Sequence, residues 1–406
     1  MAADATPYLV FAAGPVSIRP QFSVNQGFND NLFGSVNRIE DAVTVLGAGI
    51  NLQVGKPSAN SIGLGYSYSQ RWYAENHDLN SGDHSIQVGV NYRRQKLSLS
   101  GNDSLQFLTQ PIGSVSEAIP NPPAPGGESN EPGEPTTPNS PPTNPEAFVQ
   151  VPAAVINRTS RSGGYTLTYA LSDKTRLYLQ ASLSSIDYHA RISLLDQHTT
   201  RGVIGYSYRA FPKTSLFGEA SFARTTSTPN VGNDEQPSSS SYGGSLGIRG
   251  RFTAKTSGEV RVGYEAREFG NLPGPPTAPV FNASMFYQVS PKRSLALSLG
   301  RQKEISSQYS RSSYTLHTVG WRLDQALGSA RKWSASAAGG FSSYDYAGAA
   351  GTGNNYDRYS AELTVRYQIQ LWLAASLGYT FSAIRRSSSN DDYSANQVTV
   401  SLTLGY

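Results

Sequence analysis

The 406-residue sequence contains no cysteine, which excludes disulfides, thiolate metal sites and covalent haem attachment. Its histidines show no spacing typical of a metal site. No glycine-rich nucleotide loop or serine-nucleophile elbow opens a helical pattern. We therefore expect no cofactor, no metal site, no catalytic site and no enzyme. Only a catalytic pair assembled in space at the rim of a fold would escape this search. The five histidines are His77, His84, His189, His198 and His317.

Long hydrophobic runs are also absent. No stretch approaches the roughly 18 apolar residues of a membrane-spanning helix, the apolar share is 38% and the mean hydropathy is −0.39. A soluble chain of this length would need apolar runs or helical stripes for its cores. A transmembrane β-barrel needs only about half of each strand to be apolar. The formal net charge of +4 is mild and predicts no nucleic-acid partner.

What the sequence does contain is strict alternation. Every second residue from Val398 to Tyr406 is apolar or aromatic, and the residues between them are polar or small. A strand places successive side chains on opposite faces, so this segment has one apolar and one polar side. It resembles the closing strand of bacterial outer-membrane β-barrels. The start, Met1–Asp4, has no signal-peptide character, so this interpretation requires a signal peptide that is removed or absent from this sequence.

Stretches with a period of two recur along the whole chain and predict eighteen strands. The number is even, as bacterial barrels require when both ends lie on one side of the membrane. The predicted strands are Val16–Phe28, Val43–Val54, Ser61–Tyr73, Ser85–Arg93, Lys96–Phe107, Gly164–Leu171, Thr175–Ile186, Thr200–Arg209, Thr214–Arg224, Tyr242–Phe252, Gly258–Phe269, Val280–Val289, Ser294–Arg301, Ser313–Leu323, Trp333–Tyr344, Arg358–Ile369, Trp372–Ile384 and Tyr393–Tyr406.

The connections between these strands alternate between short and long. Seven of the even-numbered connections, such as Ser172–Lys174, are short, whereas most odd-numbered ones, such as Thr225–Ser241, are longer. Outer-membrane barrels have short periplasmic turns and longer extracellular loops. We therefore predict an all-β fold, a transmembrane antiparallel up-and-down β-barrel of about 18 strands. It occupies residues 1–406 as a single domain.

One predicted outer loop, at about residues 110–152, has an unusual composition. Eleven prolines lie between Pro111 and Pro145, and the segment to Asn157 has five glutamates and no Lys or Arg. Proline at this density cannot build a strand ladder or a core, so we expect a mobile or polyproline-like extracellular loop. It is either a solvated tether or a gate that folds into the mouth of the barrel.

The polar face of the predicted strands is small and hydroxylated, as in Gly63–Ser69, and an eighteen-stranded lumen lined in this way should hold water. Parity also places arginines there, so that thirteen inward cations face four inward anions, with Arg19 and Glu219 among them. Such an excess favours anions. The alternative is that Arg and Glu pair across neighbouring strands and brace the wall, as the series Glu259, Arg261, Glu265 and Arg267 suggests. The predicted pore-lining residues are Arg71, Arg93, Arg176, Arg201, Arg209, Arg249, Arg251, Glu259, Arg261, Glu265, Arg267, Arg322, Arg358, Glu362 and Arg366.

Two short segments carry a family resemblance. The first is Ile18–Val24 (Ile-Arg-Pro-Gln-Phe-Ser-Val), which runs into Gly27–Phe33 (Gly-Phe-Asn-Asp-Asn-Leu-Phe). The second is Tyr287–Leu295, with a Ser-Pro-basic turn at its centre. They resemble the β-barrel porins associated with exopolysaccharide gene clusters. The resemblance implies an outer-membrane pore for secreted polysaccharide and transfers no catalytic residue. Asp30 and Asn31 are expected to bond the backbone of a turn, or alternatively to bind calcium.

Three functions remain open, all in the cell outer membrane. The first is a pore or exporter for a hydrophilic solute, above all exopolysaccharide, which should show inward hydroxyl or aromatic tracks such as Tyr178, Phe217 and Phe286. The second is a general diffusion porin with anion preference. The third is a plugged barrel with a structural or adhesive role in a surface complex. The expected partners are the outer-membrane lipid bilayer and lipopolysaccharide or another outer-leaflet lipid. Anionic polysaccharide and periplasmic export components are further candidates, and the expected cofactors are none.

Overall fold

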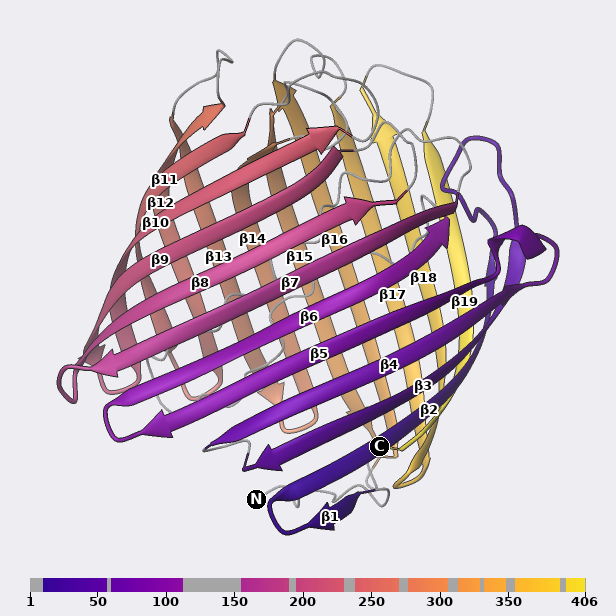
Figure 1. Cartoon of the computed structure of the whole chain (residues 1–406), viewed down its shortest axis with the longest axis horizontal. Helices are drawn as coiled ribbons and strands as arrows, with labels where there is room; N and C mark the ends of the chain where they lie inside the picture. The colour runs from indigo at the N-terminus through magenta and orange to yellow at the C-terminus, as the bar shows by residue number, and fades with distance from the viewer. Residues whose placement is uncertain are drawn as a thin grey trace.

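The computed structural model describes residues 10–56, 60–111, 155–189, 195–229, 238–269, 277–305, 313–328, 332–347, 355–387 and 392–405. They form one antiparallel sheet that closes on itself, because β19 pairs with β2 (Figure 1). The closed ring has eighteen strands, as the periodicity predicts. The barrel strands are β2 (Val16–Asn29), β3 (Asp41–Gly55), β4 (Ser61–Tyr73), β5 (Ser81–Arg94), β6 (Leu97–Pro111), β7 (Val155–Ala170), β8 (Thr175–Tyr188), β9 (Leu195–Phe211), β10 (Thr214–Pro229), β11 (Ser239–Arg251), β12 (Thr256–Phe269), β13 (Thr277–Ser290), β14 (Arg293–Ile305), β15 (Ser313–Leu327), β16 (Trp333–Ala347), β17 (Tyr356–Gln370), β18 (Leu373–Arg386) and β19 (Tyr393–Leu404).

Several strands are longer than predicted. β7 begins at Val155 rather than Gly164, because polar residues on both of its faces hide the alternation. β15 ends at Leu327 rather than Leu323, so the connection after it is also short. A short strand that was not predicted, β1 (Phe11–Ala13), pairs with the start of β2. The predicted proline-rich loop lies almost wholly outside the described residues, since β6 ends at Pro111.

In the structure all eight connections at one end of the barrel are short, one more than the sequence predicts. They span 56–60, 95–96, 171–174, 212–213, 252–255, 291–292, 328–332 and 371–372. At this end β2 begins and β19 ends (Figure 1). Short turns are typical of the periplasmic end of such barrels. The one helical segment in the described chain is a 3-10 turn, η1 (His77–Leu79), at the opposite end. No helix among these residues is long and apolar enough to cross a membrane.

The outer wall carries the apolar face of the strands. Ile62, Leu167, Leu246, Leu377 and Val400 are all exposed there. Cross-strand pairs continue the same face around the ring, for example Val54↔Ile62 and Ile62↔Val90. Water would oppose an exposed belt of this extent, whereas the hydrocarbon of a bilayer favours it. The polar faces of the strands point into the barrel.

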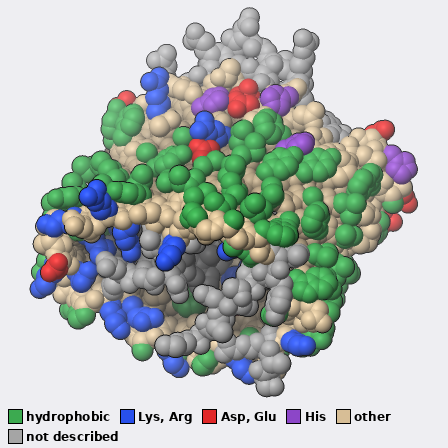
Figure 2. Space-filling view, turned by 60° about the horizontal axis from the view of Figure 1, so that its bottom comes forward, with side chains coloured by type: hydrophobic (Ala, Val, Ile, Leu, Met, Phe, Trp, Pro, Cys, Tyr) green, Lys and Arg blue, Asp and Glu red, His purple; other side chains and the backbone are tan. Residues whose placement is uncertain are grey.

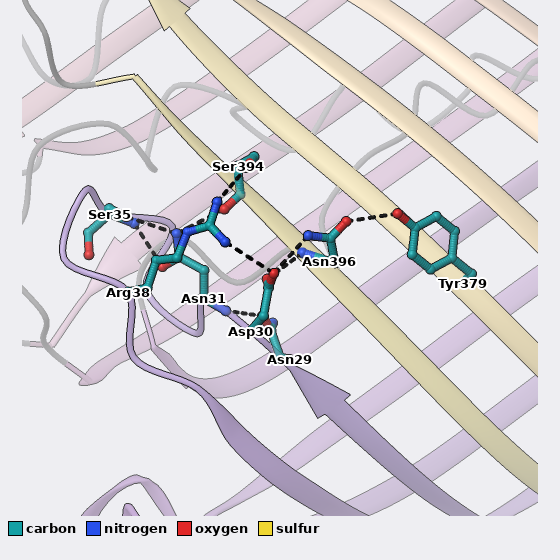
Figure 3. A network of polar contacts seen from close by, with 8 residues as sticks. All are labelled: Asn29, Asp30, Asn31, Ser35, Arg38, Tyr379, Ser394 and Asn396. Atoms are coloured by element: carbon teal, nitrogen blue, oxygen red, sulfur yellow. Dashed lines mark hydrogen bonds and ion pairs between the residues drawn. The ribbon is translucent and has the colours of Figure 1, made fainter.

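The closing seam between β2 and β19 is extended by side chains (Figure 3). The strand register ends at Gln397↔Asn29, but the Asp30 carboxylate continues it by accepting the Asn396 backbone N–H at 2.6 Å and the Asn396 side-chain amide at 2.7 Å. Next to it, the Asn31 amide donates to the Ser394 carbonyl at 3.0 Å. The turn residues Asp30 and Asn31 therefore hold the first strand to the last, which is a structural role.

We expect Asp30→Ala to weaken this seam, because the buried end of the ladder then lacks an acceptor for the Asn396 N–H. The loss should be about 1 kcal/mol in the free energy of unfolding. Urea unfolding of the protein in lipid vesicles measures it. Glu40→Ala is the control, since Glu40 is exposed at the same end of the barrel. Equal stabilities of the two variants would contradict the proposed role of Asp30.

Candidate channel lumen

One sector of the inner wall, from β18 to β4, carries few charges, Asp41 on β3 being one of them. On β18, β19, β2 and β3 the inward positions between Arg19 at one rim and Arg386 at the other are hydroxyl, amide or glycine residues with a few apolar ones. Register pairs such as Ser376↔Ser401 and Ser401↔Asn25 align these groups across the strands. The predicted small polar face of β4, from Gly63 to Ser69, continues the same surface. This sector offers hydrogen bonds with few fixed charges.

The sector of the wall around β11 carries the densest group of ionic residues. Going round the ring, β11 stands halfway from β2, so the strands around β11 lie opposite the sector from β18 to β4. The alternation of these strands points their arginines and glutamates inward. The inward ionic residues on β8 to β12 are Arg176, Arg201, Arg209, Glu219, Arg249, Arg251, Glu259, Arg261, Glu265 and Arg267.

A buried ion cluster forms around Glu219, near the short-turn end of this wall. The Arg261 guanidinium lies 3.2 Å from the Glu219 carboxylate and 2.8 Å from that of Glu259. Arg249 approaches Glu219 at 3.4 Å and Glu259 at 3.8 Å. The Tyr178 hydroxyl donates to Glu219 at 2.6 Å and accepts from Arg249 at 2.8 Å. Two arginines and two glutamates thus neutralise one another within the wall.

Two aromatic rings cover this cluster and correct a prediction. The Arg249 guanidinium lies 3.8 Å from the centre of the Phe217 ring, and Tyr178 and Phe217 are only 1% and 4% exposed. Both rings are therefore occupied by wall packing and cannot form the predicted track for sugar rings. Glycines opposite them make this possible, because a Cβ on Gly205 would lie 2.1 Å from Tyr178 and one on Gly247 would lie 2.4 Å from Phe217.

A second ionic group lies toward the opposite end of the same wall. The Arg267 guanidinium donates to Glu265 at 2.8 Å and 3.1 Å and lies 3.5 Å from Glu304. Arg261 and Arg267 each bond the glutamate two residues before them on β12. Each also pairs with a glutamate on another strand, Glu219 on β10 and Glu304 on β14, as the bracing alternative expects.

The remaining predicted residues also point inward by register. Arg71 pairs with Asp83, which in turn accepts the Thr109 backbone N–H at 2.8 Å. Arg322 bonds Asp324 at 3.0 Å, and Glu362 accepts a bond from Thr364 at 3.1 Å. The other predicted residues on inward positions of these strands are Arg93, Arg358 and Arg366.

Four arginines have a different setting. Within the described chain, Arg19, Arg201, Arg209 and Arg251 form no side-chain ion pair or hydrogen bond. Arg201 and Arg209 lie on one strand, β9, at different heights of the inner wall. Arg201 still interacts electrostatically with Glu304 on β14, whereas the charges of Arg19, Arg209 and Arg251 are directed to the lumen. These are the residues that best support the predicted positive potential.

Sequence reasoning missed several inward residues. Asp83 and Asp324 share the parity of arginines that were placed inside, but they lie just beyond the ends of the predicted strands Ser85–Arg93 and Ser313–Leu323. Arg158, Glu304 and Arg386 lie in strand ends that the periodicity did not reach. A packed tyrosine group was also missed near the outer end of β15 to β19, where the Tyr344 and Tyr356 rings stack at 4.3 Å. Its buried members are Tyr314, Leu316, Tyr344, Tyr346, Tyr356 and Ile384.

The histidines do not converge. His198 and His317 lie on outward positions and each approaches one aspartate, Asp187 at 3.1 Å and Asp345 at 3.8 Å. Within the part of the chain that the structure describes, no three His, Asp or Glu side chains gather closely enough to hold a metal ion. The site is a wall with fixed charges and hydrogen-bonding groups, an arrangement suited to contacts with a polar or charged solute.

Comparison with known proteins gives one family and a set of similar structures. A family model described as "Putative beta-barrel porin 2" matches residues 173–406. No curated protein sequence matches the chain. The outer membrane protein OpdK from Pseudomonas aeruginosa is 12% identical, covers 96% of this chain and 99% of its own, and gives a TM-score of 0.47. OccAB3 from Acinetobacter baumannii is 12% identical over 95% and 99%, with a TM-score of 0.44. OccK2 (OpdF) from Pseudomonas aeruginosa, solved in complex with glucuronate, is 11% identical over 95% and 98%, with a TM-score of 0.48.

Proposed function

The chain belongs to the β-barrel porin family whose model matches residues 173–406 and is a porin-like channel of the outer membrane; from this premise we propose that it passes an acidic exopolysaccharide out of the cell. The observation that carries the proposal is the division of the inner wall. Hydroxyl and amide groups of β18 to β4 lie opposite the arginine-bearing strands around β11. A polymer of sugar acids needs hydrogen-bond partners for its hydroxyls and cations for its carboxylates.

The cations that serve the solute in this proposal are those not used in the wall. Arg201 and Arg209 project from β9 without an ion pair in the described residues, whereas Arg249 and Arg261 are neutralised by Glu219 and Glu259. An arginine that keeps its charge free for the lumen can bind a carboxylate through two parallel bonds. Anionic selectivity should therefore depend on the β9 arginines far more than on the buried cluster.

Single-channel recording in a planar bilayer tests this function. In a salt gradient we expect a steady conductance with an anion-favouring reversal potential, and block by an acidic oligogalacturonate but not by a maltodextrin of the same length. Arg201→Gln with Arg209→Gln should move the reversal potential toward zero and weaken the block about tenfold. Arg224→Gln is the matched control, because Arg224 is exposed on the outward face of the neighbouring strand.

The outcomes separate the alternatives. Anion preference with no block by acidic oligosaccharide would favour a general diffusion porin. The burial of Tyr178 and Phe217 supports this alternative, because these rings cannot then form a track for sugars. No conductance at all would favour a plugged barrel with a structural role in a surface complex. In each case the lipid-facing belt would contact outer-leaflet lipopolysaccharide, and the short turns would be the surface available to periplasmic export components.

A further inference from the structure

The short connections at the periplasmic end carry nearly all the lysine of the protein. Seven of its eight lysines lie in them, and together these connections contain eight Lys or Arg residues and one Asp. The described parts of the connections at the opposite end contain five Asp or Glu residues and one Arg. The barrel is therefore electrically polarised along its axis. Figure 2, which brings the short-turn end forward, shows Lys and Arg side chains gathered around the hollowed opening at this end.

Six of these lysines occupy the same structural position. Each is the last residue of its turn and immediately precedes the next strand. Its backbone carbonyl accepts an N–H from near the end of the strand after that one, at 2.7 to 2.8 Å. The repeated bond places the six residues at equivalent points around the rim. They are Lys96, Lys174, Lys213, Lys255, Lys292 and Lys332, and all six are exposed.

The lysine side chains belong to the rim rather than to the lipid-facing wall. The apolar residues that end the outer belt near these turns, Phe211 and Phe252, are 63% and 42% exposed, so an apolar girdle occupies the level where lipid headgroups begin. The Lys292 ammonium bonds the Gly328 carbonyl of the next turn at 2.8 Å, and that of Lys255 bonds the Val289 carbonyl at 3.3 Å. These two side chains run along the rim, from one turn to its neighbour.

We infer that this lysine ring is the entrance for a polyanion and sets the direction of passage, from the periplasmic end to the outer end. The inference rests on the proposed function and adds the entrance and the electrostatic cause of outward passage. A ring of like charge at the mouth of a low-dielectric tube raises the local concentration of a polyanion and its rate of entry. Lysine suits capture without tight binding, because its ammonium is strongly hydrated and forms no fixed bidentate pair.

The outer end of the barrel carries the opposite charge. A channel that collected anions from outside would be helped by cations at its outer mouth, but the described parts of the connections there have five carboxylates and one Arg. Their field lowers the rate at which a polyanion enters from outside. It also lowers the rate at which a released chain returns. The arginines of the inner wall lie between these two ends. The electrostatic potential along the barrel axis therefore becomes less favourable to a polyanion only near the outer end, where the polymer leaves.

Sided block of the single-channel current tests the inference with oligogalacturonate as the probe. The chain has no cysteine, so Ala254→Cys in an exposed periplasmic turn allows a membrane-impermeant thiol reagent to report the orientation of each inserted barrel. At about 0.1 M salt we expect the on-rate of block from the periplasmic side to exceed that from the outer side by about tenfold or more. The ratio should fall toward one in about 1 M salt, where the Debye length is about 3 Å.

Two sextuple variants identify the cause. Replacing the six lysines by glutamine should abolish the difference between the two sides, whereas replacing them by arginine should keep it, because only the first change removes charge. Equal on-rates from both sides in the wild type, faster block from outside, or sidedness that survives in the glutamine variant would each overturn the inference. A wild type that conducts no ions contradicts the proposed function itself, so the two failures are distinguishable.

Discussion

Glu219→Gln is expected to lower the free energy of unfolding by about 3 kcal/mol, the range found when one partner of a buried ion pair is removed. The Glu219 side chain is 3% exposed and touches Arg249 at 3.4 Å and Arg261 at 3.2 Å. Removing its charge leaves these two guanidinium groups with only Glu259 to share. Urea unfolding in lipid vesicles, with the fluorescence of the four tryptophans as the signal, measures the loss.

Two further variants make this result specific. Ser245→Ala removes a hydroxyl that donates to the same carboxylate at 3.4 Å and leaves every charge in place, so it should cost well under about 1 kcal/mol. Glu219→Leu combined with Arg249→Met should recover most of the loss, because an apolar pair of similar volume replaces a charge pair. If Glu219→Gln is no worse than Ser245→Ala, the cluster does not brace the wall.

Asp103→Leu is expected to shift the folding equilibrium toward the unfolded state by about thirtyfold, although it replaces a charged residue by an apolar one on the apolar wall. Asp103 faces outward, with Leu105 and Phe107 beyond it on the same face of β6. Its carboxylate accepts from the Arg161 guanidinium at 2.8 Å and 3.2 Å. Without Asp103 the guanidinium faces lipid with no counter-charge, which is costly at this level of a barrel.

The double variant decides whether pairing is the reason. Asp103→Leu with Arg161→Leu removes both charges from the apolar belt, so its folding equilibrium should return to the wild-type value or exceed it. The two single variants and the double variant form a mutant cycle that isolates the interaction between Asp103 and Arg161. A double variant as unstable as Asp103→Leu alone would show that the carboxylate acts through some contact other than the ion pair.

Many of the residues that line the lumen could be predicted from the sequence. Parity placed the predicted arginines and glutamates on the inward face because a strand has a period of two, whatever its neighbours are. That parity reaches Asp83 and Asp324 only once their strands are drawn to the observed ends. It could not find Arg158 or Glu304, because those strand ends have polar residues on both faces and show no alternation. Asp103 and Arg161 were missed for a different reason. Charged residues on an apolar face interrupt the alternation, and only the structure shows that these two form an ion pair.

The sequence by itself determined the features that depend only on neighbouring residues. The period of two, the turn residues and the alternation of short and long connections are properties of neighbouring residues, and from them follow the eighteen strands and the apolar belt. Ring closure and register decided the rest. Tyr178 and Arg249 are 71 residues apart and meet because three intervening strand pairings fix their heights. Which arginines are cancelled in the wall and which face the lumen therefore depends on the tertiary structure, since an ion pair requires a few ångströms between groups whose positions no local pattern specifies.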